Sequence, residues 1–135
     1  MMPDAPTNAD APACVFCALR DGPRVVMRNR LSFAIRDTTP VTPLHTLVLP
    51  YRHAATYFDL TDDELAAAND LLRRLRLNIL SADPSVEGFN VGANIGVISG
   101  QTIFHCHIHL IPRRKGDVGD PLGGVRAVIP ERMRY

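Results

Sequence analysis

The segment Ile103-Phe104-His105-Cys106-His107-Ile108-His109-Leu110-Ile111 alternates histidine with other, mostly apolar residues. It holds three of the five histidines in the chain, and we call His105, His107 and His109 the histidine row. The alternation predicts a strand over 103–111 that ends at Pro112, with the three imidazoles on one face and the apolar side chains on the other. Successive histidines are then about 6.6 Å apart, so they can address one site or two adjoining sites.

Three interpretations of the histidine row compete. The first is a polar sheet face on which histidine is incidental, and the strict alternation disfavours it. The second is a metal site built on His-x-His with a third ligand elsewhere. The third is nucleophilic or acid–base catalysis, for which neutral imidazole is suited near pH 7. A row of imidazoles suits phosphate ester chemistry, because one ring can attack phosphorus while its neighbour stabilises the non-bridging oxygens.

The residues just before the histidine row favour a phosphate ligand. The neutral hydrogen-bond donors there are Asn94, Ser99, Gln101 and Thr102. Gly96 and Gly100 allow the backbone to approach a ligand closely. The sequence has no GxxxxGK[ST] pattern, which excludes P-loop chemistry.

A second motif, Cys14-Val15-Phe16-Cys17, is a CxxC. Such a pair is typical either of a redox site or of half a zinc site. No predicted strand precedes it to build a thioredoxin-like redox unit. Two incidental small cysteines are a further interpretation, and a zinc site needs two more ligands, since the sequence has no second CxxC. Histidines must then supply two further ligands, and the candidates are His53, just past a predicted strand end, and one member of the histidine row. Cys106 alternates away from the histidines and is predicted to be a core residue.

Length and composition predict one soluble globular domain, because 135 residues with 46% hydrophobic and 21% charged residues are close to average values. The formal net charge is +1, which excludes a general field that attracts nucleic acid or membranes. We find no apolar run long enough to span a bilayer and no signal peptide. We therefore expect a cytoplasmic protein with neither nucleic-acid nor membrane partners, and three cysteines make a disulfide scaffold unlikely to be its framework.

Local patterns predict the remaining elements. Thr61 and Glu64 form a capping box that opens a helix over residues 62–81. Its predicted apolar face, with spacings of three and four, consists of Leu65, Ala68, Leu72, Leu75 and Ile79. The expected strands are Val25 to Met27, Leu31 to Arg36, Thr46 to Leu49 and Phe89 to Ala93. Residues 1–13 are predicted to be a mobile tail, and residues 114–135 an irregular segment rich in glycine and proline.

Taken together, Gly100-Gln101-Thr102 and the histidine row resemble the signature of the histidine-triad (HIT) family, which is His-φ-His-φ-His-φ-φ after Gly-Gln-Ser/Thr, with φ apolar. The resemblance extends from about Cys14 to Arg113. It implies an α+β fold of the HIT type, in which an antiparallel sheet of about five strands carries one long helix, here about 62–81. It also implies a two-fold homodimer and a single HIT domain over 14–135.

The resemblance implies an enzyme that acts on nucleoside phosphates. The expected reaction is hydrolysis at the α-phosphorus of a dinucleoside polyphosphate such as diadenosine tetraphosphate, or of a nucleoside phosphoramidate such as adenosine phosphoramidate, through a nucleotidyl-histidine intermediate. The expected substrate is a purine nucleoside phosphate, and nucleotidyltransferase or phosphorylase activity remains open. The alternative is a zinc-stabilised nucleotide-binding sensor or adaptor with incidental catalysis. A metallohydrolase with zinc on the histidine row ranks last, because it leaves the CxxC and His53 without a purpose.

Site residues follow from the resemblance position by position. His107 corresponds to the nucleophile, and we expect a backbone carbonyl to hold its other nitrogen. The other expected catalytic residues are His109, on the phosphate oxygens, Gln101 and Thr102, on the phosphate or leaving group, and His45, buried behind the row. The expected nucleotide contacts are Asp37 on the ribose, Asn94 on the phosphate, and Val15, Phe16, Leu19 and Ile35 around the base. The expected ligands of a structural zinc are Cys14, Cys17, His53 and His105. Leu44 stands where the family usually has glycine, and we expect it to narrow the loop near the ribose.

Overall fold

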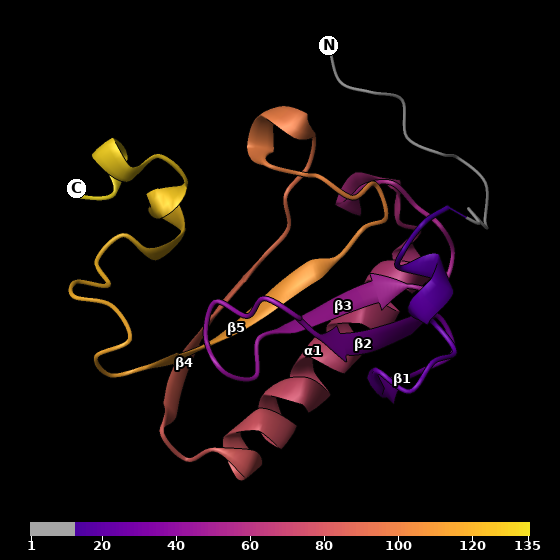
Figure 1. Cartoon of the computed structure of the whole chain (residues 1–135), viewed down its shortest axis with the longest axis horizontal. Coiled ribbons are helices and arrows are strands. Elements are labelled where there is room, and N and C mark those ends of the chain that lie inside the picture. The colour runs from indigo at the N-terminus through magenta and orange to yellow at the C-terminus, as the bar shows by residue number, and fades with distance from the viewer. Residues whose placement is uncertain (1–12) are drawn as a thin grey trace.

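The computed structural model describes residues 13–135, so the predicted tail lies almost wholly outside the described residues. Its centre is one antiparallel sheet with the strand order β1-β2-β3-β5-β4. The strands are β1 (Val25–Arg28), β2 (Ser32–Arg36), β3 (Thr46–Pro50), β4 (Val86–Gly92) and β5 (Ile108–Arg114). One long helix, α1 (Asp62–Ala82), packs along one face of the sheet (Figure 1). The predicted α+β architecture is confirmed.

Helix α1 begins where the capping box predicted. The Thr61 hydroxyl accepts the Glu64 N–H at 3.1 Å, and the Glu64 carboxylate accepts the Thr61 N–H at 2.9 Å. The helix buries Leu71, Leu75 and Ile79 completely against the sheet. Leu71 was missing from the predicted apolar face, where Leu72 stood instead, and Leu72 is only partly buried. The buried face of α1 is therefore shifted by one residue at its centre, from Leu72 to Leu71.

Strands β2 and β3 are buried on both faces, so alternate side chains enter two different cores. On the α1 side, Ala34 and Val48 join the helix residues. On the opposite side the second core contains Phe33, Ile35, Leu47, Leu49 and Phe16. Phe16 comes from the segment that leads into a short 3₁₀ turn, η1 (Cys17–Leu19), and this segment covers the face that α1 leaves open.

Strand β5 differs from its prediction at both ends, since it starts at Ile108 rather than at residue 103 and continues past Pro112 to Arg114. The residues just before Ile108 bond to the loop after β3 and do not pair with a neighbouring strand. There the Cys106 N–H donates to the Ala54 carbonyl at 2.7 Å. Pro112 is tolerated because β3 no longer pairs with β5 beyond Leu110, so its missing N–H can face the unpaired side.

Short 3₁₀ turns lie between the other elements and in the C-terminal segment. The 3₁₀ turns are η2 (Tyr57–Asp59), η3 (Val97–Ser99), η4 (Gly124–Val128) and η5 (Pro130–Arg132). Strand β4 begins at Val86, three residues before its predicted start. The C-terminal segment beyond β5 runs beside the β4 edge of the sheet and away from β1 (Figure 1). Within residues 13–135, no helix combines the length and apolar character needed to cross a membrane.

Leu44 has a left-handed backbone, with φ at 70°, and among the described residues it is the one non-glycine with positive φ. Its side chain packs against the core beneath α1, and the narrowing of the loop near the ribose stays a prediction. A left-handed conformation costs an L-residue roughly 1–2 kcal/mol.

We expect Leu44→Gly to be more stable than Leu44→Ala by about 1 kcal/mol, because both variants lose the same packing and only glycine relieves the left-handed strain. Urea denaturation of the two variants measures this difference. An alanine variant that equals or exceeds the glycine variant in stability would show that no strain is stored at this position.

Candidate active site and metal centre

The ring of His107 is held by a hydrogen bond to the main chain. Its Nδ1 lies 2.8 Å from the carbonyl oxygen of His105. A carbonyl only accepts, so Nδ1 carries the proton and Nε2 of the neutral ring keeps its lone pair. The ring is half-buried, with the edge of Phe16 against it at a centroid distance of 4.9 Å. The expectation that a backbone carbonyl holds this ring agrees with the hydrogen bond.

His109 has the opposite tautomer, which a chain of hydrogen bonds assigns. The Val41 N–H donates to Nδ1 of His45 at 3.0 Å, so the neutral His45 ring carries its proton on Nε2. That Nε2 lies 2.9 Å from Nδ1 of His109 and donates to it. His109 therefore keeps its own proton on Nε2 and can donate it to a ligand.

Burial lowers the pKa of His109 to about 4, with further lowering from His107 and His45 and an opposing effect of Asp37. The ring is thus neutral at pH 7, as the tautomer chain requires. In the unfolded chain the same ring has the ordinary histidine pKa of 6.5. Between these two values the unfolded state binds more protons, so this group makes stability fall as the pH falls.

We expect the free energy of unfolding to decrease from pH 7 to pH 5, and we expect His109→Asn to lose less stability over that interval than the wild type. Urea denaturation at the two pH values measures both losses. Equal losses in the two proteins would contradict a depressed pKa at His109.

Asp37, which is predicted to bind the ribose, lies beside His45. One of its carboxylate oxygens lies 3.6 Å from Nε2 of His45, and the other accepts the Thr39 N–H at 2.9 Å. The phosphate candidates Asn94 and Thr102 are both exposed. Gly92 pairs with His109 across the β4–β5 ladder, and a Cβ at this glycine would meet no atom within 4 Å. The surface beside His109 is therefore open to a ligand.

Gln101 is placed differently from its predicted contact with phosphate. It is buried, and its amide nitrogen donates to the carbonyls of Ala55 at 2.7 Å and of Ile103 at 3.1 Å. Its amide oxygen accepts the Gly96 N–H at 2.9 Å. The bond to Ala55 ties the loop before the histidine row to the loop after β3, and the other two bonds lie within the loop that contains Gln101. The role on phosphate stays a prediction, and in this arrangement Gln101 holds backbone.

The predicted base-pocket residues lie at three depths. Val15 is 52% exposed, Leu19 is half-buried, and Phe16 is buried. Ile35 has no exposed surface. The contacts of these four residues with a base stay a prediction.

Cys14, Cys17, His53 and His105 come together in one cluster, with their ligand atoms all within 4.8 Å of one another. Nδ1 of His105 lies 3.6 Å from Sγ of Cys14 and 3.4 Å from Sγ of Cys17, and Nδ1 of His53 lies 3.3 Å from Sγ of Cys17. A tetrahedral zinc with ordinary bond lengths separates its nitrogen and sulfur ligands by about 3.6 Å.

The orientation of His105 also fits a metal ligand. Its Nε2 donates to the Pro50 carbonyl at 2.9 Å, which leaves the lone pair of Nδ1 facing the two sulfurs. His53 and His105 are both buried, and Nε2 of His53 has no hydrogen-bond partner among the described residues. A donor set of two thiolates and two imidazoles is typical of structural zinc.

A second cluster, formed by Asp37, His45 and His109, has ligand atoms equally close together. It suits a metal poorly, because Nε2 of His45 must carry a proton while Nδ1 accepts the Val41 N–H. Among the described residues, no candidate metal group contains all three members of the histidine row. The geometry therefore gives no support to zinc on the row itself.

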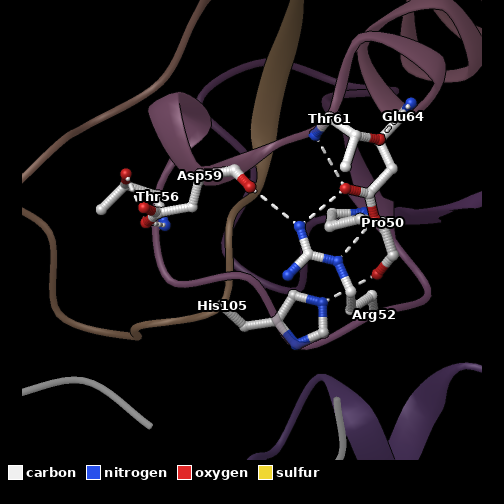
Figure 2. Close-up of polar contacts among 7 residues, drawn as sticks. All are labelled: Pro50, Arg52, Thr56, Asp59, Thr61, Glu64 and His105. Atoms are coloured by element: carbon white, nitrogen blue, oxygen red, sulfur yellow. Dashed lines mark hydrogen bonds and ion pairs between the residues drawn. The ribbon is translucent and has the colours of Figure 1, made fainter. Parts of the chain in front are cut away.

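Arg52 and Glu64 were not predicted to belong to the site. Figure 2 shows the Arg52 guanidinium against the Glu64 carboxylate, close to Pro50 and His105. The only signal in the sequence was the capping box, which identified Glu64 as a helix residue. Nothing in that pattern pointed to the arginine twelve residues earlier.

Comparison with known proteins identifies the class. The HIT domain profile matches residues 22–116, which is most of the chain. The protein belongs to the HIT family.

Curated relatives are identical to this chain at about a third of the aligned positions. An uncharacterised 16.1 kDa HIT-like protein of Mycoplasma pneumoniae is 34% identical over 78% of this chain and 75% of its own length. The asymmetrical bis(5'-nucleosyl)-tetraphosphatase of Schizosaccharomyces pombe is 35% identical, over 73% of this chain and 54% of the relative. The AP-4-A phosphorylase of Mycobacterium tuberculosis is 34% identical, over 82% of this chain and 57% of the relative. The chain thus spans just over half of these two enzymes.

Solved structures agree with the fold. A HIT family protein from Bacillus anthracis has a TM-score of 0.73 and 34% identity, covering 82% of this chain and 80% of its own. A zinc-bound histidine triad family protein from Mycobacterium smegmatis has a TM-score of 0.70 and 32% identity, covering 78% of each chain.

Proposed function

We propose that this protein is a nucleoside-phosphate hydrolase that cleaves at the α-phosphorus of a dinucleoside polyphosphate or a nucleoside phosphoramidate, with His107 as the nucleophile. The observation that carries the proposal is the pair of opposite tautomers, His107 with a free lone pair and His109 with a free N–H. The named activities of the fission-yeast tetraphosphatase and the mycobacterial phosphorylase support this substrate class.

In the first step, Nε2 of His107 attacks the α-phosphorus. A P–N bond forms, the bond from phosphorus to the leaving group breaks, and the leaving group departs with the electron pair. The ring gains positive charge, which strengthens its hydrogen bond to the His105 carbonyl. His109 donates its Nε2–H to a non-bridging oxygen, where negative charge is concentrated.

In the second step, water attacks phosphorus and the P–N bond breaks. The electron pair returns to Nε2 of His107, the proton of water goes to solvent, and a nucleoside monophosphate is released. Two displacements of this kind produce ping-pong kinetics when the acceptor is varied. Phosphate in place of water would make the enzyme a phosphorylase.

We propose a structural zinc on Cys14, Cys17, His53 and His105. The fit of the donor set and its distances supports it, as does the zinc in the Mycobacterium smegmatis neighbour. A metal there would fix the segment that carries Phe16 against the loop after β3. Among the described residues Cys14 and Cys17 form no disulfide, which suits the cytoplasmic setting expected from the sequence.

We further propose that two copies pair through α1 and the edge strand β4. A groove of about 680 Å³ lies between these elements, lined by apolar residues that include Leu65, Leu72 and Ile95. Phe58 is 79% exposed and Val91 is 50% exposed at its border. An apolar groove beside an unpaired strand edge is typical of an interface between copies.

The test is intact-protein mass spectrometry after brief mixing with diadenosine tetraphosphate and, separately, with adenosine phosphoramidate. We expect a transient adenylyl adduct, and the faster substrate identifies the leaving group. Nucleotide binding without an adduct and without turnover would overturn the proposal in favour of a zinc-stabilised nucleotide sensor.

A further inference from the structure

An ion pair joins the loop after β3 to the first turn of α1 (Figure 2). Nε and one NH2 group of Arg52 donate to the two carboxylate oxygens of Glu64 at 3.1 and 2.7 Å. The same NH2 group donates to the Asp59 carbonyl at 2.8 Å. Glu64 is 6% exposed, and its carboxylate also accepts the Thr61 N–H of the capping box. The guanidinium is therefore held against a carboxylate that the helix itself fixes.

The loop that Arg52 anchors reaches the histidine row directly. Two residues after Arg52, the Ala54 carbonyl accepts the Cys106 N–H at 2.7 Å, which is a short bond. The next carbonyl, of Ala55, accepts from Gln101 at 2.7 Å. The loop thus bonds to the segment 101–106 at two points.

The Cys106 N–H and the His105 carbonyl belong to one planar peptide unit. The N–H of this unit bonds to Ala54, and its carbonyl holds Nδ1 of His107 at 2.8 Å. Because the unit is rigid, a shift of Ala54 tilts it and turns the bond that aims His107. The two hydrogen bonds of one peptide also polarise each other, which strengthens both.

We propose that the Arg52–Glu64 ion pair is a positioning device for the nucleophile: it fixes Ala54, and Ala54 fixes the peptide unit that orients His107. The proposal rests on the proposed function of His107. Neither Arg52 nor Glu64 contacts a member of the catalytic pair His107 and His109 through any hydrogen bond of the described residues. The pair should therefore act on the chemical step and not on substrate binding.

The test compares Glu64→Gln with Asp70→Asn. Each change replaces a carboxylate of α1 by its amide and breaks an ion pair, and Asp70 pairs with Arg74 on the exposed side of the helix. We expect Glu64→Gln to lower kcat about tenfold or more with KM within about twofold, as loss of a transition-state interaction does. We expect Asp70→Asn to leave both constants unchanged. Arg52→Lys keeps the charge but not the two-point contact and should lie between wild type and Glu64→Gln.

A second readout is independent of turnover. Amide hydrogen exchange at Cys106 reports the bond to Ala54, and we expect it to be faster in Glu64→Gln than in wild type or Asp70→Asn. Zinc content is measured on every sample. An unchanged kcat, or a kcat that falls only in proportion to lost zinc, would overturn the positioning role.

The two proposals fail in distinguishable ways. If the wild type forms no adduct on His107, the proposed function fails, whatever the variants do. If the wild type forms the adduct while Glu64→Gln exchanges its Cys106 amide and turns over as the wild type does, only the positioning role fails.

Discussion

His107→Ala is expected to lower kcat by at least about 10⁴-fold, since removal of a covalent nucleophile takes away the reaction path itself. The fold should remain, because His107 is half-buried and makes one hydrogen bond, to a carbonyl that can find water in its place. Steady-state kinetics with diadenosine tetraphosphate measure the loss, and circular dichroism with thermal melting checks the fold. The adenylyl adduct should be absent from the variant.

A suitable comparison is Arg74→Ala, which removes an exposed ion pair on α1 and should retain wild-type rates. Retention of more than a small fraction of activity by a folded His107→Ala protein would disprove its role as nucleophile. An adduct that persists in that variant would place the covalent chemistry on another residue.

Removal of the metal is expected to cost about 3–5 kcal/mol of stability and to lower Tm by about 10–20 °C, because a structural zinc contributes its binding free energy to folding. Cys17→Ser should have the same effect as chelation, since Cys17 lies against both histidines of the cluster. Thermal melting with and without a chelator, combined with metal analysis, measures both effects.

Cys106→Ala is the matched control for the thiols. Cys106 is buried, burial raises its pKa to about 12, and it lies outside the Cys2His2 cluster. We expect this variant to bind the same amount of metal as wild type and to respond to chelation in the same way. A wild-type protein whose melting is unchanged by chelation would refute the structural zinc.

Local signals predicted the fold well. The start of α1 follows from Thr61 and Glu64, which lie three residues apart and need no distant partner. Strand β5 was misplaced at both ends because its limits depend on tertiary contacts. Ala54, about fifty residues earlier, takes the Cys106 N–H away from any ladder, and the end of pairing with β3 makes room for Pro112.

The candidate site was predicted to the extent that its residues carry a family signature. The structure brings together His45, His107 and His109 and, separately, the four predicted zinc ligands. Signature positions do not reveal hydrogen-bond partners, so the three backbone bonds of Gln101 were not foreseen. The Arg52–Glu64 pair was missed for a similar reason, because each residue has an unremarkable role in its own local segment.

His105 contacts the cysteine cluster through its side chain and His107 through its main chain. The imidazole faces the cysteines, whereas His107 is held by the main-chain carbonyl, a group that every amino acid possesses. Substitution at this position can therefore abolish metal binding while the acceptor for His107 persists. The two contacts can therefore diverge separately in evolution. A sequence that loses the cysteines and the imidazole of residue 105 still keeps the main-chain carbonyl that holds His107.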